Sequence, residues 1–103
     1  MNTLKKLQEH LNFPPVETTP GYFYKEPAPH ITCADGTTMS VQASEFHCST
    51  PRENVGPYTA VEVYFCGIVE AWSEHGDGDG DEPYTYLPIE LVADEIDRRG
   101  GFK

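Results

Sequence analysis

Residues 53–97 contain twelve carboxylates and neither lysine nor arginine. The carboxylates are Glu53, Glu62, Glu70, Glu74, Asp77, Asp79, Asp81, Glu82, Glu90, Asp94, Glu95 and Asp97. Like charges repel one another in a compact chain, so any fold of this protein must tolerate an electrostatic cost in this half. The acidity serves either solubility alone or a surface that meets something basic.

The size and composition of the chain fit one folded domain. It has 103 residues and a mass of 11.5 kDa, which is enough for a modest core. With 38% hydrophobic and 12% aromatic residues, it is somewhat apolar-poor but too aromatic for a disordered chain. We expect residues 1–29 to form an N-terminal helix and an extended arm, and residues 30–103 to form the α+β core.

The net charge of −10 limits the partners of this protein. It disfavours direct binding to nucleic acids and anionic membranes, because both would repel the chain. No apolar run approaches the roughly 20 residues that cross a bilayer, and residues 1–13 lack the apolar stretch of a signal peptide. The odd set of Cys33, Cys48 and Cys66 lacks the spacing of a disulfide framework. We therefore expect a cytoplasmic protein with reduced thiols and no membrane contact.

Two helices are predicted near the ends of the chain. Leucines recur at helical spacing over residues 3–12, with Thr3 as the expected N-cap, and Pro14-Pro15 ends that helix. A second helix follows Pro88, which suits the first helical position, and stops at Gly100. Its apolar stripe should be buried and consists of Ile89, Val92, Ala93 and Ile96.

Four strands are predicted between these helices. Residues 31–34 and 37–43 flank Asp35-Gly36, a strong signal for a hairpin with a type I′ turn. Residues 58–66 alternate in β-branched and aromatic side chains, and residues 84–87 predict a short fourth strand. The predicted fold class is α+β: a three- to four-stranded antiparallel sheet, a C-terminal helix packed on one face, and a short N-terminal helix.

Residues 14–29 join the first helix to these strands. They are rich in Pro and Thr and include the aromatic trio Tyr22, Phe23 and Tyr24. We expect an extended arm that packs against another surface rather than a free linker.

Residues 73–82 form a Gly/Asp loop whose spacing suggests a cation site. The D-x-D-x-D opening matches a calcium loop, since hard cations take several oxygens from one short segment. However, the sixth position of such a loop should be Gly and is Glu82, and the twelfth should be Glu and is Pro88. The alternating glycines also oppose a preorganised cage, because ordering them costs backbone entropy. A weak cation site stays open, but we expect a flexible solvated loop or a partner-binding loop, with no metal and no cofactor.

The histidines and cysteines predict neither a zinc site nor a reactive thiol. His30, Cys33, His47 and Cys48 have the residue types of zinc ligands, but adjacent side chains such as His47 and Cys48 diverge on a strand. Cys48, beside His47 and near Arg52, is the candidate nucleophilic thiol, yet the acidity of the chain opposes a low thiol pKa. There is no Gly-rich phosphate loop, G-x-S-x-G or H-E-x-x-H motif. The sequence does not predict an enzyme.

Arg52 is the lone cation at the edge of the acidic half. It lies in a loop whose ends are fixed by Pro51 and Gly56-Pro57. Its guanidinium should pair with a strand carboxylate such as Glu62, which would be a structural role. The functional alternative is a contact loop made of Arg52, Glu53 and Asn54.

Two segments carry a recognisable pattern. Residues 31–65 contain the Asp-Gly hairpin, S-V-Q-A-S, P-R, G-P-Y and V-E-V, and residues 84–101 contain the C-terminal helix that ends in Gly-Gly. This pattern resembles small phage-encoded accessory proteins of unassigned function, over residues 31–102. The resemblance implies one fold and a phage origin, hence a bacterial host cell. It implies no catalytic residues.

The first functional hypothesis is an acidic phage or prophage protein that inhibits a host defence or nucleic-acid-processing protein. Its carboxylates would occupy a basic surface where Lys and Arg hold phosphates, as a nucleic-acid mimic of the anti-CRISPR type. Such contacts speed association and weaken with salt. Trp72 would be an apolar anchor, since Trp favours interface hot spots, with core packing as its alternative role. The expected contact residues are Glu70, Trp72, Glu74, Asp77, Asp79, Asp81, Glu82 and Arg52.

Two other classes of function stay open. A structural or housekeeping phage protein would self-assemble through Tyr22, Phe23 and Tyr24, with acidity serving solubility only. A metal-dependent or thiol enzyme would need bound zinc or a reactive Cys48. The sequence predicts neither the oligomeric state nor the target.

Overall fold

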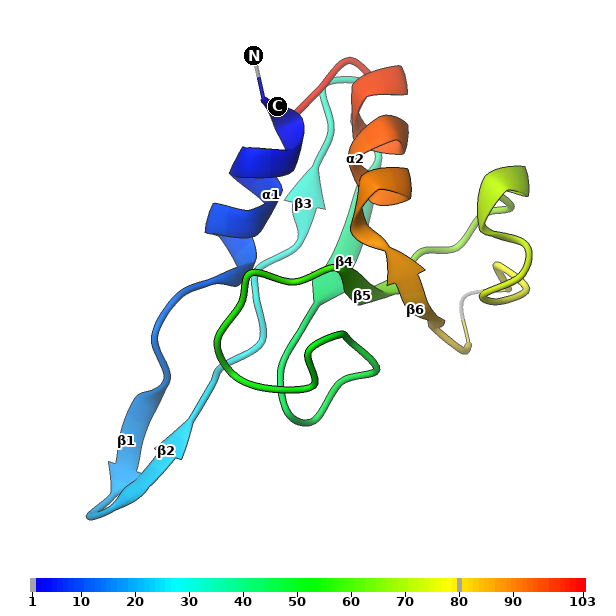
Figure 1. The fold of residues 1–103 in the computed structure, drawn as a ribbon. Helices are drawn as coiled ribbons and strands as arrows, with labels where there is room; N and C mark the ends of the chain where they lie inside the picture. Colours follow the sequence, from blue (N-terminus) through cyan, green and yellow to red (C-terminus); the bar gives the residue numbers. More distant parts are fainter. Residues whose placement is uncertain (1, 80) are drawn as a thin grey trace.

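The computed structural model describes residues 2–79 and 81–103 and confirms the α+β class (Figure 1). The helices are α1 (Thr3–Leu11), the short 3₁₀ helix η1 (Glu70–Trp72) and α2 (Ile89–Arg98). A two-stranded hairpin consists of β1 (Val16–Thr19) and β2 (Tyr22–Tyr24). An antiparallel sheet with the order β3-β4-β5-β6 consists of β3 (Ile31–Thr32), β4 (Thr38–Gln42), β5 (Ala60–Tyr64) and β6 (Tyr84–Pro88).

The strands of the four-stranded sheet pair in chain order. Val41 of β4 lies opposite Val63 of β5, and Val61 of β5 lies opposite Leu87 of β6. All four side chains are fully buried. Because side chains alternate between the faces of a strand, this register gives the sheet one continuous apolar face.

The turn between β3 and β4 differs from the expected type I′ turn. Type I′ requires positive φ at both central residues, but φ is +92° at Gly36 and is not positive at Asp35. The Gly36 amide donates to the Cys33 carbonyl at 2.9 Å, and the Cys33 amide donates to the Thr37 carbonyl at 2.7 Å. This pattern fits a three-residue loop in which a type I turn precedes a left-handed glycine.

Helices α1 and α2 lie side by side and pack on the sheet (Figure 1). Leu7 and Leu11 of α1 share one core with the predicted apolar stripe of α2, which is buried as expected. Pro88 was expected at the first helical position of α2. It is instead the N-cap, and the helix begins one residue later at Ile89. None of the helices within residues 2–79 and 81–103 has the length and apolar character to cross a membrane.

The N-cap of α1 is Asn2 rather than Thr3. The Asn2 side chain accepts a hydrogen bond from the Lys5 amide at 2.9 Å. The Thr3 hydroxyl instead donates to the Asp97 carboxylate of α2. Thr3 therefore joins the two helices, and its neighbour satisfies the free amide at the helix start.

Residues 16–24, part of the arm expected to pack against another surface, form a hairpin that projects from the body. The hairpin of β1 and β2 stands away from the sheet and helices (Figure 1). Every residue of β1 is exposed, and Tyr22 and Phe23 are each 53% exposed. The aromatic trio therefore lies on a projecting element instead of covering a core.

Candidate functional site

The acidic residues expected to bind a partner lie on one projecting element, residues 70–82, which we call the lobe. It begins with η1 and ends before β6, and Gly80 lies outside the described residues. In Figure 1 the lobe is drawn in yellow-green and yellow, away from α1 and from the hairpin. Its described carboxylates are all exposed: Glu70, Glu74, Asp77, Asp79, Asp81 and Glu82.

Trp72 fastens the lobe to the core. Its side chain is 0% exposed and packs edge-on against Tyr84, with ring centroids 5.1 Å apart, and against Phe65 at 6.1 Å. Its indole N–H donates to the Leu91 carbonyl of α2 at 3.4 Å. The prediction that Trp72 contacts a partner is therefore wrong, because its side chain is wholly buried in the core, which was its alternative role.

At Gly76 and Gly78 of the lobe, the surrounding atoms leave no room for a side chain. Gly78 has φ of +74°, and a Cβ atom there would collide with the Gly67 carbonyl and the Tyr84 hydroxyl. A Cβ at Gly76 would lie 2.9 Å from a ring carbon of Tyr84. Hydrogen bonds join Gly67 N to Gly78 O at 3.0 Å and the Tyr84 hydroxyl to Gly67 O at 2.8 Å. The alternating glycines thus allow close packing, which corrects their interpretation as a sign of a flexible solvated loop.

The same alternation directs the carboxylates outward. Gly78 is buried, and its neighbours Asp77 and Asp79 are exposed. The Asp79 carboxylate accepts from the amides of Asp81 at 2.9 Å and Glu82 at 3.3 Å, which closes the turn before β6. Gly78 and Tyr84 are therefore positioning residues that sequence reasoning missed. The Gly-x-Gly spacing beside an aromatic strand was the signal that could have revealed them.

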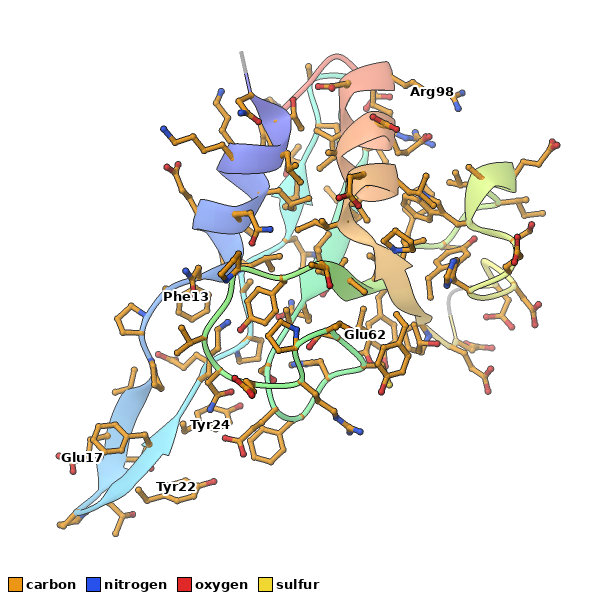
Figure 2. The ribbon with its side chains drawn as sticks, in the orientation of Figure 1. Phe13, Glu17, Tyr22, Tyr24, Glu62 and Arg98 are labelled. Atoms are coloured by element: carbon orange, nitrogen blue, oxygen red, sulfur yellow. The ribbon has the colours of Figure 1, made fainter. Side chains whose placement is uncertain are left out.

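No cation neutralises the lobe in the described structure. The ion pairs among the described residues all involve Arg98 and Arg99, which bind Glu95 and Asp35. Figure 2 shows carboxylate oxygens around the lobe, while the labelled Arg98 extends from the end of α2. Unpaired like charges on one element produce a strong negative potential that attracts cationic groups.

Arg52 belongs to a different surface. It is exposed in the loop between β4 and β5, which Figure 1 draws in green, apart from the lobe. The expected pairing with Glu62 is wrong: the buried Glu62 carboxylate accepts from the Cys48 amide at 3.1 Å (Figure 2 labels Glu62). Arg52 forms no ion pair with any described carboxylate. It is therefore available for a contact, and its place in a contact surface stays a prediction.

The histidine and cysteine candidates among the described residues do not come together as a metal centre. Nδ1 of His47 lies 2.6 Å from the Ser44 hydroxyl, which also accepts from the Phe46 amide at 3.0 Å. Burial lowers the pKa of His47, so the ring is neutral at pH 7. Ser44 is buried and serves this turn, so it offers no accessible nucleophile. Among the described residues, no three His, Cys, Asp or Glu side chains cluster as metal ligands.

A concave surface of the described structure lies away from the lobe. An open hollow of about 600 Å³ has a mixed polar and apolar lining of His30, Thr37, Thr38, Met39, Ser40, Tyr64, Phe65 and Cys66. None of the eight expected contact residues lines it. Small-molecule sites are concave and enclosed, whereas the lobe projects, so its shape suits contact with another macromolecule.

Comparison with known proteins gives no match: no family model, no curated protein and no solved structure matches this chain.

Proposed function

We propose that this protein is a binding protein whose lobe occupies a basic, nucleic-acid-binding surface of another protein. The observation that carries this proposal is the lobe itself. Its six described carboxylates are exposed, no lysine or arginine occurs between residues 53 and 97, and buried Trp72 fastens the element to the core.

The way the lobe is held favours binding. Ordering a loop on association costs free energy, and a loop that is already packed avoids much of that cost. The contacts of Gly78 with Gly67 and of Trp72 with Tyr84 supply this packing before any partner arrives. Carboxylates on such an element attract a basic surface over a distance and speed association, most strongly at low salt.

The chemistry favours a surface that ordinarily holds phosphates. Lys and Arg side chains bind carboxylate and phosphate oxygens with the same hydrogen-bonding groups. A row of carboxylates can therefore compete with a nucleic-acid backbone for one set of cations. Together with the resemblance to phage proteins, this supports inhibition of a host defence or nucleic-acid-processing protein, with CRISPR effectors and nucleases as the target class.

A displacement experiment tests the proposal. Proteins from a bacterial lysate are bound to DNA-cellulose, washed, and eluted with the purified protein, and the released proteins are identified by mass spectrometry. The lobe variant carries Glu74→Gln, Asp77→Asn, Asp79→Asn, Asp81→Asn and Glu82→Gln. A matched control also loses five negative charges, at exposed positions outside the lobe: Glu9→Gln, Glu26→Gln, Glu53→Gln, Glu90→Gln and Asp94→Asn.

The wild type and the control variant should release the same small set of proteins, and the lobe variant should release none of them. Release should fall as salt rises, because salt screens exposed charges. Equal release by all three proteins would show that overall acidity acts, not the lobe. No release by the wild type would overturn the proposal.

A second candidate function is self-assembly through the hairpin. The observation that favours it is the exposure of Val16, Tyr22 and Phe23 on an element that projects from the body. Exposed apolar groups on a projecting element can form an interface between copies. Sedimentation velocity across a concentration series tests it: association that Phe23→Ser removes would support it, and a monomer at all concentrations would exclude it.

A further inference from the structure

A lysine is buried at the base of the hairpin. Lys25 directly follows β2 and is only 4% exposed. Its ammonium nitrogen donates hydrogen bonds to the Leu11 carbonyl at 2.5 Å, the Ala43 carbonyl at 2.9 Å and the Tyr58 hydroxyl at 3.0 Å. A protonated lysine has three donors, so all of them are used inside the protein.

Two aromatic rings complete the surroundings of this ammonium. Its nitrogen lies 5.0 Å from the centre of the Phe13 ring and 4.8 Å from that of Tyr58. At these distances the negative faces of the rings attract a cation. Carbonyl oxygens and aromatic rings together form a cage for Lys25, with no carboxylate paired to it among residues 2–79 and 81–103.

A buried charge without a counter-ion is costly. Removing an ammonium from water is unfavourable even after the surroundings relax, and hydrophobic residues of similar volume often replace buried charges without loss of stability. Consistent with that cost, burial lowers the pKa of Lys25. Core stability alone therefore gives no reason for a lysine at this position.

The three acceptors explain what a lysine does there. Leu11 ends α1, Ala43 follows β4, and Tyr58 precedes β5, so one side chain binds three separate segments of the body. Phe13, in the segment between α1 and β1, places its ring against the same ammonium. Both strands of the hairpin therefore meet the body at Lys25, and Figure 2 shows Phe13 at this junction.

Beyond this junction the hairpin has little support. Its strands are four and three residues long, and nearly all of their side chains are exposed. An isolated two-stranded hairpin is marginally stable in water. In Figure 2, Tyr22 and Tyr24 extend from one side of the hairpin and Glu17 from the other. The direction of these side chains relative to the body thus depends on the base of the hairpin.

We propose that Lys25 is a positioning residue that fixes the direction of the β1–β2 hairpin, so that Tyr22 and Phe23 are held at a constant place relative to the lobe. The inference rests on the contacts of Lys25 and holds whether or not the lobe binds a nucleic-acid-binding protein. A lysine that only fills the core would affect global stability and leave the hairpin unchanged. The two roles therefore predict different measurements.

Residual dipolar couplings and ¹⁵N relaxation of the full chain distinguish these roles. In the wild type, the amides of residues 16–24 should fit the same alignment tensor as those of β4 and β5. In Lys25→Met, the amides of the sheet should keep their wild-type couplings, while those of the hairpin should no longer fit the alignment tensor of the sheet. The order parameters of the hairpin amides should fall from about 0.85 to below about 0.6. Lys6→Met, at an exposed position of α1, is the control and should match the wild type.

A hairpin that keeps the wild-type couplings in Lys25→Met would overturn the proposal. Should that variant not fold, Tyr58→Phe gives the answer, because it removes one acceptor and keeps the ring. A partial loss of the hairpin couplings in Tyr58→Phe, with an intact sheet, would support the proposal. Wild-type hairpin couplings in Tyr58→Phe would overturn it.

Discussion

The lobe of residues 70–82 and the hairpin of residues 16–24 both project from the body, but different chemistry fixes them. The lobe is charged outside and apolar beneath, where Trp72 is wholly buried against Tyr84. The hairpin is largely uncharged and exposed, and a buried cation, Lys25, holds its base. Burial of a large aromatic ring is stabilising, whereas burial of an unpaired ammonium is costly.

This difference indicates that the lobe unfolds together with the core, whereas the hairpin can change independently of it. Replacing a residue beneath the lobe should disturb the whole protein, since the core around Trp72 contains residues of β6 and α2. Replacing a residue on the hairpin should change only the hairpin. A contact surface carried on the lobe is then preserved as long as the protein stays folded, and one on the hairpin depends on its base.

Trp72→Ala should have the largest effect on stability. Truncating a buried Trp removes its apolar contacts and leaves a cavity, which typically costs about 3–5 kcal/mol. Urea unfolding should show this loss in the free energy of unfolding. A change smaller than about 1 kcal/mol, as expected of a surface site, would mean that the ring does not join the lobe to the core.

Two of the glycines with positive φ, one in each projecting element, offer a matched pair. Gly78→Ala in the lobe meets both an unfavourable φ and a collision, and overpacking of this kind costs about 1–3 kcal/mol. Gly21→Ala in the hairpin has φ of +83° but nothing within 4 Å of the new Cβ. Gly78→Ala should therefore lower the midpoint of urea unfolding more than Gly21→Ala does. Equal shifts would contradict the close packing of the lobe.

The base of the hairpin should show a pH dependence in the alkaline range. Burial lowers the pKa of Lys25 from 10.5 in the folded protein. Between that lowered pKa and 10.5, Lys25 is protonated to a greater extent in the unfolded chain than in the folded protein. Stability should then rise with pH across that range relative to Lys25→Met. Tyr58, whose pKa burial raises, stays protonated beside it, and His47, whose pKa is lowered, is already neutral. A constant difference between the two proteins across alkaline unfolding curves would contradict the buried charge.

Phe23→Ser should have the smallest effect. The ring is half exposed on an element outside the core, so the free energy of unfolding should change by less than about 0.5 kcal/mol. Thermal and urea unfolding of this variant measure the change. A loss comparable to that of Trp72→Ala would show that the hairpin packs against the body after all.

Helices and strands whose buried residues recur at a regular spacing could be predicted from the sequence. Val61 and Val63 alternate along β5, and Ile89, Val92 and Ile96 recur at helical spacing, so their burial follows from the pattern. The N-cap of α1 was missed because Asn2 and Thr3 are both good caps, and the partner of Thr3 lies on α2.

The projecting elements could not be predicted, because their supports are distant in sequence. Gly78 depends on Gly67 and on Tyr84, and Lys25 depends on carbonyls at positions 11 and 43. Composition therefore misled for the lobe, where a Gly/Asp-rich segment suggested flexibility and the structure shows close packing. For the aromatic segment, composition indicated a contact surface but not the hairpin that carries it.

Carbodiimide cross-linking tests the central claim, contact between the lobe and a basic surface, most directly. The reagent joins a carboxylate to a lysine in direct contact, and cleavage after Trp72 and Tyr84 releases residues 73–84, which carry Glu74, Asp77, Asp79, Asp81 and Glu82 of the lobe. In a bacterial lysate, we expect cross-links concentrated in this peptide and joined to lysines of a nucleic-acid-binding surface. Cross-links spread evenly over peptides that contain Glu9, Glu53 or Glu90, or joined to lysines outside such a surface, would contradict it.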